Sequence, residues 1–251
     1  MKIALISDVH LEYNTELDIE LPEADVLVCA GDIGSPFTQA YTRFLKEMNE
    51  MYDTVIVIPG NHEYYQQSPS QALTHPRSMG SVERRIQEVC DQTNVVFLQK
   101  ECVDIDDVRF YGCTLWADPF SSGGEDFWDG QNDTKHISDL DRPEDYVEMH
   151  HEHVEWLDTM LRQAPKDKKI VVVTHHLPSY TLIDPKFKHS KKNGYYASHC
   201  DDLVPHADLW LAGHTHRFMD CSLDGTTRFC CNPVGYPWES LRYHGDLCIT
   251  L

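Results

Sequence analysis

The chain has 251 residues, 41% of them hydrophobic, which suits a single domain over residues 1–251 with a sizeable core. Its apolar runs are far shorter than the roughly 20 residues of a membrane helix, and the N-terminal run is too short for a signal peptide. Nine cysteines without C-x-x-C spacing suit a reducing compartment, so we expect a cytoplasmic protein. The 41 acidic residues outnumber 21 basic ones, and the net charge of −20 argues against long nucleic acid and membranes as partners.

Short apolar runs, often β-branched, recur along the chain and predict strands that are buried on both faces of their sheet. In chain order these runs cover residues 3–6, 26–30, 55–58, 95–98, 110–115, 170–173 and 209–212. Helical spacing of apolar residues predicts helices over 38–51, 81–92 and 143–162. Residues 102–105 and 108–113 suit a hairpin, and short strands over 218–223, 228–231 and 247–251 suit antiparallel additions. The pattern as a whole predicts an α/β fold.

Two segments between these elements have an unusual composition. Residues 117–142 are rich in Gly, Ser and Asp with aromatic residues inserted, which is typical of a lid or specificity loop. Residues 185–192 read P-K-F-K-H-S-K-K and hold four lysines in an otherwise acidic chain. This second segment is either a solvated loop or a rim that attracts an anionic substrate.

Side chains that can bind metal follow five of the predicted strands. In open α/β sheets, ligands bind beyond the carboxyl ends of the strands, so we expect these side chains to be neighbours. Taken singly, Asp and Asn are most often turn formers, and a lone His is more often a surface or hydrogen-bonded core residue. The set in chain order is Asp8 and His10, Asp32, Asn61 with His62, His175 with His176, and His214 with His216.

The residue types favour a particular kind of metal site. On extended backbone, His214 and His216 would point the same way, as would Asp8 and His10. Asp32 has two carboxylate oxygens and can bridge two cations. Mixed nitrogen and oxygen ligands favour Mn, Fe, Zn, Co or Ni over calcium and magnesium. A shared carboxylate suits the paired metals used for in-line displacement at phosphorus.

The motifs D-V-H, G-D-I, G-N-H-E, T-H and G-H-T-H occur in this order between residues 8 and 216. Together they resemble the signature of the calcineurin-like metallophosphoesterase superfamily. Y-G-C-T-L-W, T-H-H-L-P-S and C-N-P-V-G-Y further resemble a group of small bacterial and phage phosphohydrolases. The resemblance implies a two-sheet β-sandwich flanked by helices in four layers, with two divalent metal ions. One metal would take Asp8, His10, Asp32 and His216, and the other Asp32, Asn61, His175 and His214.

The resemblance also implies a mechanism and a substrate class. The attacking group would be a metal-bound hydroxide, Mn would be the preferred metal, and His62 would protonate the leaving group. Glu63, next to His62, could orient its ring or be a surface carboxylate. Arg217 could hold phosphate or seat its own loop, and His176 could contact substrate or a metal ligand. The expected substrate is a small phosphate monoester or diester, with nucleotides among the candidates.

Several alternatives stay open at this level. The chain could be a non-catalytic binding scaffold, although His62 is present, or a nuclease, although a basic stripe is missing. His150, His151 and His153 have spacing that a metal could use, but the surrounding glutamates favour a solvated helix face. Trp116 suits core packing, whereas Trp128, Tyr236 and Trp238 could pack or stack on a base. The sequence does not decide the oligomeric state.

Overall fold

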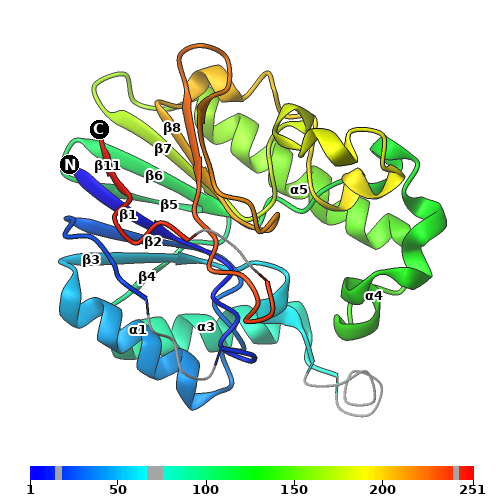
Figure 1. Cartoon of the computed structure of the whole chain (residues 1–251), viewed down its shortest axis with the longest axis horizontal. Coiled ribbons are helices and arrows are strands. Elements are labelled where there is room, and N and C mark those ends of the chain that lie inside the picture. The colour runs from blue at the N-terminus through cyan, green and yellow to red at the C-terminus, as the bar shows by residue number, and fades with distance from the viewer. Residues whose placement is uncertain (15–18, 67–75, 240–242) are drawn as a thin grey trace.

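The computed structural model describes residues 1–14, 19–66, 76–239 and 243–251. Two sheets face each other (Figure 1). The first has the strand order β11-β1-β2-β3-β4, in which β1, β2, β3 and β4 run parallel and β11 runs antiparallel to β1. Its strands are β1 (Lys2–Ile6), β2 (Val26–Ala30), β3 (Thr54–Ile58), β4 (Val96–Phe97) and β11 (Cys248–Thr250).

The second sheet has the order β5-β6-β7-β8-β10-β9. Strands β6, β7, β8 and β10 run parallel, and the outer strands β5 and β9 run antiparallel to their neighbours. The strands are β5 (Glu101–Ile105), β6 (Val108–Cys113), β7 (Lys169–Thr174), β8 (Leu209–Ala212), β9 (Met219–Ser222) and β10 (Arg228–Cys231). The hairpin that the sequence predicted around Asp106 and Asp107 is therefore β5–β6.

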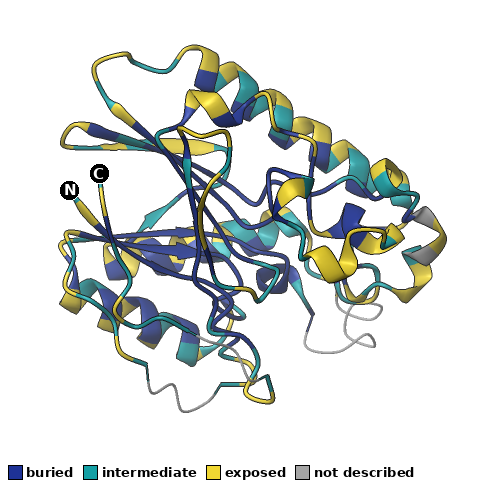
Figure 2. Cartoon of the chain, turned by 45° about the horizontal axis from the view of Figure 1, so that its top comes forward, coloured by how far each residue is buried: buried dark blue, intermediate teal, exposed yellow. Residues whose placement is uncertain are grey.

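Helices cover the outer face of each sheet, which makes four layers (Figure 1). Helices α1 (Gln39–Met51) and α3 (Met79–Thr93) cover the first sheet, and α5 (Pro143–Arg162) covers the second. Three clusters of buried apolar side chains lie between successive layers, and the central one joins the two sheets. Figure 2 shows this buried interior running through both sheets. The predicted four-layer, two-sheet α/β fold is confirmed.

Local sequence explains why the helices begin where they do. Thr38 caps α1 by accepting a hydrogen bond from the backbone N–H of Tyr41, and Ser78 caps α3 by accepting one from Ser81. The buried residues of α1 recur at helical spacing, at Tyr41, Phe44, Leu45 and Met48. Helix α3 ends at Asn94, which adopts the left-handed conformation that stops a helix. Capping thus marks where α1 and α3 begin, and the apolar spacing of α1 determines which face packs against the sheet.

One sequence-based expectation needs correction. The added C-terminal strands are not all antiparallel, because β10 pairs with β8 in parallel. Residues 117–142, the expected lid or specificity loop, contain the 3₁₀ turns η2 (Pro119–Ser122) and η3 (Glu125–Gly130) and the short helix α4 (Asn132–His136). All nine cysteines are free thiols, and within the described ranges no helix is both long and apolar enough to cross a membrane.

Candidate metal centre

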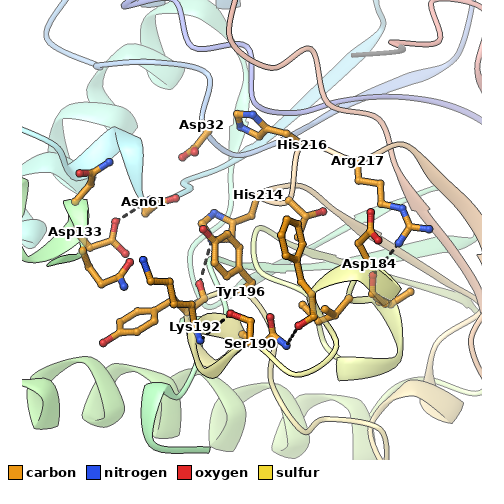
Figure 3. A pocket seen from close by; sticks show the side chains of 18 of the residues that line it. Asp32, Asn61, Asp133, Asp184, Ser190, Lys192, Tyr196, His214, His216 and Arg217 are labelled. Carbon is orange, nitrogen blue, oxygen red and sulfur yellow. Dashed lines mark hydrogen bonds between the residues drawn. The ribbon is translucent and has the colours of Figure 1, made fainter. Parts of the chain in front are cut away.

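The seven predicted ligands all lie in the turns that follow strand ends. Asp8 and His10 follow β1, Asp32 follows β2 and Asn61 follows β3, all in the first sheet. His175 follows β7, and His214 and His216 follow β8, in the second sheet. Figure 3 shows Asp32, Asn61, His214 and His216 gathered on one side of a shared cavity. The sandwich therefore brings the ends of both sheets to a single site.

The backbone at these residues is unusual. Asp8, His10, Asp32, His214 and His216 all have positive φ, between 48° and 69°. Non-glycine residues rarely adopt this left-handed conformation, and such strained residues cluster at functional sites. The expected extended backbone at 8–10 and 214–216 is therefore wrong. These side chains converge because each is held in a tight turn.

Glycines in the motifs leave room for the donor side chains. A Cβ at Gly60 would lie 2.2 Å from Asp32 Oδ1, and a Cβ at Gly31 would lie 2.5 Å from His175 Nδ1. Gly31 also has a φ of +85°, a conformation that favours glycine. The glycines of G-D-I and G-N-H-E are therefore needed for the close approach of β2, β3 and β7.

The donor atoms form groups that share members. Asp8, His10 and His216 form one group within 4.8 Å, and Asp32, His175 and His214 form another; a third group, of His10, Asp32 and His62, shares one member with each. Asp32 links the two, because its Oδ2 lies 3.3 Å from His175 Nε2 and 3.9 Å from His10 Nε2. The geometry matches a pair of cations that share one carboxylate.

Asn61 joins the second group through its carbonyl oxygen. Asn61 Oδ1 lies 3.1 Å from His175 Nε2. Its amide nitrogen points the other way and donates to Asp133 Oδ1 at 2.8 Å. An amide oxygen that faces the donor group is the orientation a metal ligand needs.

The four histidines in these groups have their second ring nitrogens tied to oxygen acceptors. Each outward nitrogen therefore donates its N–H, and the inward nitrogen presents a lone pair. Two such inward atoms, Nε2 of His10 and of His216, lie only 3.0 Å apart, which is repulsive unless a proton or a cation lies between them. This arrangement is typical of histidines that bind metal. The outward contacts join His10 to Glu12 (3.1 Å), His216 to Glu239 (2.6 Å), His175 to the Ala30 carbonyl (2.9 Å) and His214 to the Tyr195 carbonyl (3.1 Å).

Charges around the centre keep its carboxylates ionised. Burial alone would raise the pKa of Asp8, but the hydrogen bond and charge of His216 lower it to about 2. Burial likewise opposes ionisation of Asp32, yet the charge of His175 holds its pKa well below the usual range. Conversely, burial would lower the pKa of His175, whereas the Asp32 carboxylate raises it to about 10. Protons and cations therefore compete for the same donors, as at metal sites generally.

His62 lies at the edge of the donor groups. Its Nδ1 lies 2.8 Å from Glu12 Oε1, and its Nε2 lies 3.2 Å from the hydroxyl of Tyr236. The ring stacks on Tyr65 with centroids 4.2 Å apart. Sequence reasoning missed Glu12, although it follows the D-V-H motif at the same two-residue spacing that separates Asp8 from His10.

Glu63 does not orient His62, so that expectation is wrong. Its buried carboxylate accepts backbone N–H groups from Asp32 (2.9 Å), Ile33 (2.7 Å), Gly34 (3.3 Å) and Gly60 (2.7 Å). Burial and the nearby charge of Asp32 raise its pKa to about 7. Glu63 thus ties the turn after β2 to the turn after β3 and so holds Asp32 beside Asn61.

The two expected substrate contacts differ in position. His176 is fully buried behind the centre, with its ring 4.2 Å from that of His214, and it does not line the cavity. Its Nδ1 lies 3.3 Å from the Thr114 carbonyl and its Nε2 lies 3.4 Å from the Tyr146 hydroxyl. Arg217 lines the cavity. The structure therefore places His176 against His214 and Arg217 at the wall of the cavity.

The three histidines of α5 do not form a solvated face, which corrects a further expectation. His150 and His153 are buried, and only His151 is exposed. His150 Nδ1 donates to the Trp116 carbonyl at 2.7 Å, and His153 Nδ1 accepts the Leu115 N–H at 3.1 Å. Neither belongs to a group of potential metal donors among the described residues. Both instead satisfy backbone atoms that follow β6.

A cavity of about 500 Å³ opens beside the donor groups. Its second wall is the segment 182–196, and Figure 3 shows Tyr196 and Lys192 across it from Asp32 and Asn61. Tyr236 lines the cavity, whereas Trp116 is buried in the core. Trp238 is 67% exposed and stacks on Tyr236 with centroids 4.8 Å apart. The expected loops 117–142 and 185–192 both reach the wall, through Asp133 and through Lys186 and Lys192.

The fold and the site define an α/β sandwich whose strand ends hold a donor set for two metals. The family model for calcineurin-like phosphoesterases matches residues 1–218. The chain therefore belongs to the calcineurin-like phosphoesterases, whose members are dinuclear metal-dependent hydrolases.

Similarity to individual proteins extends over nearly the whole chain. "Uncharacterized protein L509" of Acanthamoeba polyphaga mimivirus is 26% identical over 95% of this chain and 92% of its own length. Among solved structures, the phosphopantetheinyl hydrolase PptH of Mycobacterium tuberculosis has a TM-score of 0.75 at 20% identity, covering 94% of this chain and 90% of that one. A dimetal phosphatase from Danio rerio has a TM-score of 0.49 at 13% identity, and the match covers 92% of this chain and 86% of that one.

Proposed function

We propose that this protein hydrolyses small phosphate esters with two divalent metal ions, Mn by preference, in the cytoplasm. The observation that supports the proposal most directly is the set of inward lone pairs and carboxylate oxygens that meet at Asp32. Asp8, His10, Asp32 and His216 would hold one ion, and Asp32, Asn61, His175 and His214 the other. When bound, such cations polarise a phosphoryl group and make water nucleophilic near neutral pH.

The residues beside the donors have roles of their own. His62 Nε2 is available at the cavity wall to give a proton to the leaving oxygen. Burial would lower its pKa, but the charges of Asp32 and Glu12 raise it, so the ring stays protonated to a higher pH. Glu12 holds His62 through Nδ1, which turns Nε2 toward the cavity and the Tyr236 hydroxyl.

The cavity supports a small organic phosphoester as substrate. Its volume of about 500 Å³ lies within the range of small-molecule sites. The net charge of −20 disfavours long nucleic acid, so a nuclease is not proposed. Nucleotides, cyclic nucleotides and phosphopantetheine esters belong in the first substrate panel, the last because a protein of similar fold is named for that group.

The direct test is turnover of p-nitrophenyl phosphate and bis-p-nitrophenyl phosphate. We expect hydrolysis of at least one with Mn added and its loss with chelator. The relative rates of the two compounds will assign monoester or diester preference. Absence of hydrolysis of both, in protein shown to contain Mn, would overturn the proposal and leave the binding-scaffold alternative.

A second test isolates His62. His62→Ala should retain Mn but lose roughly 10²- to 10⁴-fold in turnover of esters with poor leaving groups. The loss should be much smaller for p-nitrophenyl esters, which need little protonation of the leaving oxygen. His151→Ala, at an exposed position on α5, is the matched control. Equal losses on good and poor leaving groups would remove His62 from this role.

A further inference from the structure

The cavity continues past the donor groups toward a wall with exposed apolar side chains. Phe187 is 54% exposed and Tyr196 is 38% exposed, and both line the cavity together with Leu182 and Ile183. Figure 3 shows Tyr196 between His214 and the 190–192 segment. Large apolar side chains that stay exposed in a cavity are typical of a ligand surface. Inorganic phosphate alone would leave this part of the cavity unused.

Arg217 lies at the same end of the cavity and has unused hydrogen-bonding capacity. Its guanidinium makes one marginal hydrogen bond, 3.5 Å from Nη1 to the Leu182 carbonyl. No carboxylate oxygen of the described residues lies within 4.0 Å of it, and its neighbour Asp184 is paired with Lys186 at 3.3 Å. A guanidinium has five N–H donors in a planar fork that fits a phosphate. The two positive charges of Arg217 and Lys186 exceed the single negative charge of Asp184, so these three side chains carry one net positive charge.

We propose that this end of the cavity is a subsite for a second phosphate on the substrate, bound by Arg217. The apolar part of the leaving group would lie along Tyr196 and Phe187, between that phosphate and the one that is hydrolysed. The substrate class is then a phosphoester whose leaving group has an apolar or aromatic centre and ends in another phosphate. This inference rests on the proposed function for the position of the reacting phosphate.

The experiment compares ligands that differ only in the second phosphate. Hexyl phosphate and 1,6-hexanediol bisphosphate are tested as inhibitors of whichever p-nitrophenyl ester the wild type hydrolyses, which serves as the reporter, and by calorimetric titration of the Mn-loaded protein. We expect the bisphosphate to bind roughly 10-fold more tightly, as one charge-assisted contact would give. Arg217→Gln should remove most of that difference in affinity. Lys188→Gln should keep it, because Lys188 belongs to the wall segment 182–196 but does not line the cavity.

The outcomes separate the two proposals. Equal binding of the two ligands by the wild type would overturn the subsite, as would an undiminished difference in Arg217→Gln. Failure of the proposed function shows differently, as absence of reporter hydrolysis in every variant, and calorimetry still measures the second phosphate. If Arg217→Gln is unstable, Phe187→Ala provides another test, because it should weaken both alkyl ligands by a similar factor.

A separate observation concerns Asp133 of α4. Its carboxylate is buried and accepts hydrogen bonds from Asn61 Nδ2 (2.8 Å), the Tyr65 hydroxyl (2.5 Å) and the Tyr146 hydroxyl (3.1 Å). Tyr65 also accepts from Asn61 Nδ2 at 3.1 Å. Two acceptors on one side fix the amide nitrogen there, so the Asn61 oxygen must face His175.

We infer that Asp133 is a positioning residue that sets the orientation of Asn61 for metal binding. The segment 117–142 then completes the centre from outside the strand ends. This inference also rests on the proposed function, because Asn61 must be a ligand. Asp133→Asn removes the negative charge that strengthens these hydrogen bonds and replaces one acceptor oxygen by an N–H donor of similar size, so the side chain can no longer accept from Asn61, Tyr65 and Tyr146 together and holds the Asn61 amide more weakly.

Calorimetric titration with Mn tests this without any turnover measurement. We expect one of two Mn ions to bind roughly 10- to 100-fold more weakly in Asp133→Asn, as for other residues that support metal ligands. Tyr65→Phe should give a smaller loss, and Tyr146→Phe, which contacts the other oxygen, the smallest. Two ions bound as in the wild type by Asp133→Asn would overturn the inference. A wild type that binds no Mn would instead overturn the proposed function.

Discussion

Buried histidines gather in two regions of this molecule, and the contrast between them shows what makes a metal site. At the strand ends, His10 and His216 direct ring nitrogens at each other and at carboxylates. On α5, His150 and His153 direct theirs at backbone atoms of the segment after β6. His10, His150 and His153 are buried and His216 is partly buried, and the histidines of both regions have suggestive spacing in the sequence.

The physical difference is where the unsatisfied lone pairs lie. At the strand ends the outward nitrogens of His10, His175, His214 and His216 are tied to acceptors, so the inward nitrogens face one another, Asp8, Asp32 and the Asn61 oxygen. On α5 no carboxylate joins the rings, and burial lowers the pKa of His153 to about 3. The strand-end region therefore needs protons or cations among its donor atoms, whereas the histidines of α5 satisfy their partners as neutral imidazoles. The predictions below test this distinction, from the largest expected effect to the smallest.

Asp32 should be the most sensitive position, because both donor groups depend on it. Asp32→Asn removes the charge but keeps the size of the side chain. We expect Mn binding to weaken by roughly 100-fold or more at both positions, the upper end of losses at supported metal sites, with turnover falling in parallel. Calorimetry and metal analysis of the purified variant measure the effect. Retention of two tightly bound ions would show that Asp32 does not bridge them.

Substitution of Glu239 should give the next largest loss of Mn affinity, because Glu239 acts on the metal site through one histidine, His216. Its Oε2 accepts from His216 Nδ1 at 2.6 Å and from the Tyr236 N–H at 2.9 Å. Glu239→Gln should weaken one Mn ion by roughly 10- to 100-fold and leave the other nearly unchanged. Glu155→Gln, on the exposed side of α5, is the control. Equal weakening of both ions would contradict the separate roles of His216 and His214.

The same contrast shows what could be predicted from the sequence. Apolar runs located the parallel strands, and residues at the carboxyl ends of neighbouring strands lie at one edge of their sheet, so Asp8 and Asp32 could be placed together. His175 follows β7 of the other sheet, and its approach depends on how the two sheets face each other. The contact between Asp133 and Asn61 could not be predicted from the sequence, because only the tertiary fold brings α4 to Asn61. Glu12 has a local signal at two residues from His10, but its contact with His62 joins the turns after β1 and β3.

The error at α5 has a different cause. Surrounding glutamates indicated a polar helix face, and Glu148, Glu152 and Glu155 are indeed exposed. Nothing in a helical pattern shows that the backbone after β6 needs partners, which His150 and His153 supply. A polar side chain can be buried whenever it satisfies a buried backbone group. Such pairings depend on how the helix lies over the sheet, which periodicity does not fix.

Substitution of His153 should have a smaller effect, which appears in the pH dependence of the free energy of unfolding. Its folded pKa of about 3 lies below the ordinary value of 6.5, because burial and then Lys100 and His150 oppose its charge. The contribution of neutral His153 to the free energy of unfolding is therefore present above pH 6.5. It is lost as the pH falls, because the unfolded chain gains a proton that the folded chain does not. His153→Gln keeps an acceptor for the Leu115 N–H but cannot titrate.

Urea unfolding in the presence of chelator measures this difference. Between pH 6 and pH 5 the wild type should lose about 1 kcal/mol more free energy of unfolding than His153→Gln. The lower stability of the variant at pH 7 does not affect the result, because the comparison is between the slopes of free energy of unfolding against pH for the two proteins. Parallel slopes for the two proteins would show that His153 is not held neutral by the fold.

His151 should give the smallest effect, although it stands between the two buried histidines in the sequence. It is exposed on α5, and its only described ring neighbour is His150 at 5.4 Å. His151→Ala should change the free energy of unfolding by no more than about 0.5 kcal/mol and leave Mn affinity unchanged. Alanine also favours a helix more than histidine does, so any change should be a slight stabilisation. A loss of Mn binding in this variant would mean that proximity in the sequence, and not the direction of the lone pairs, decides which histidines hold metal.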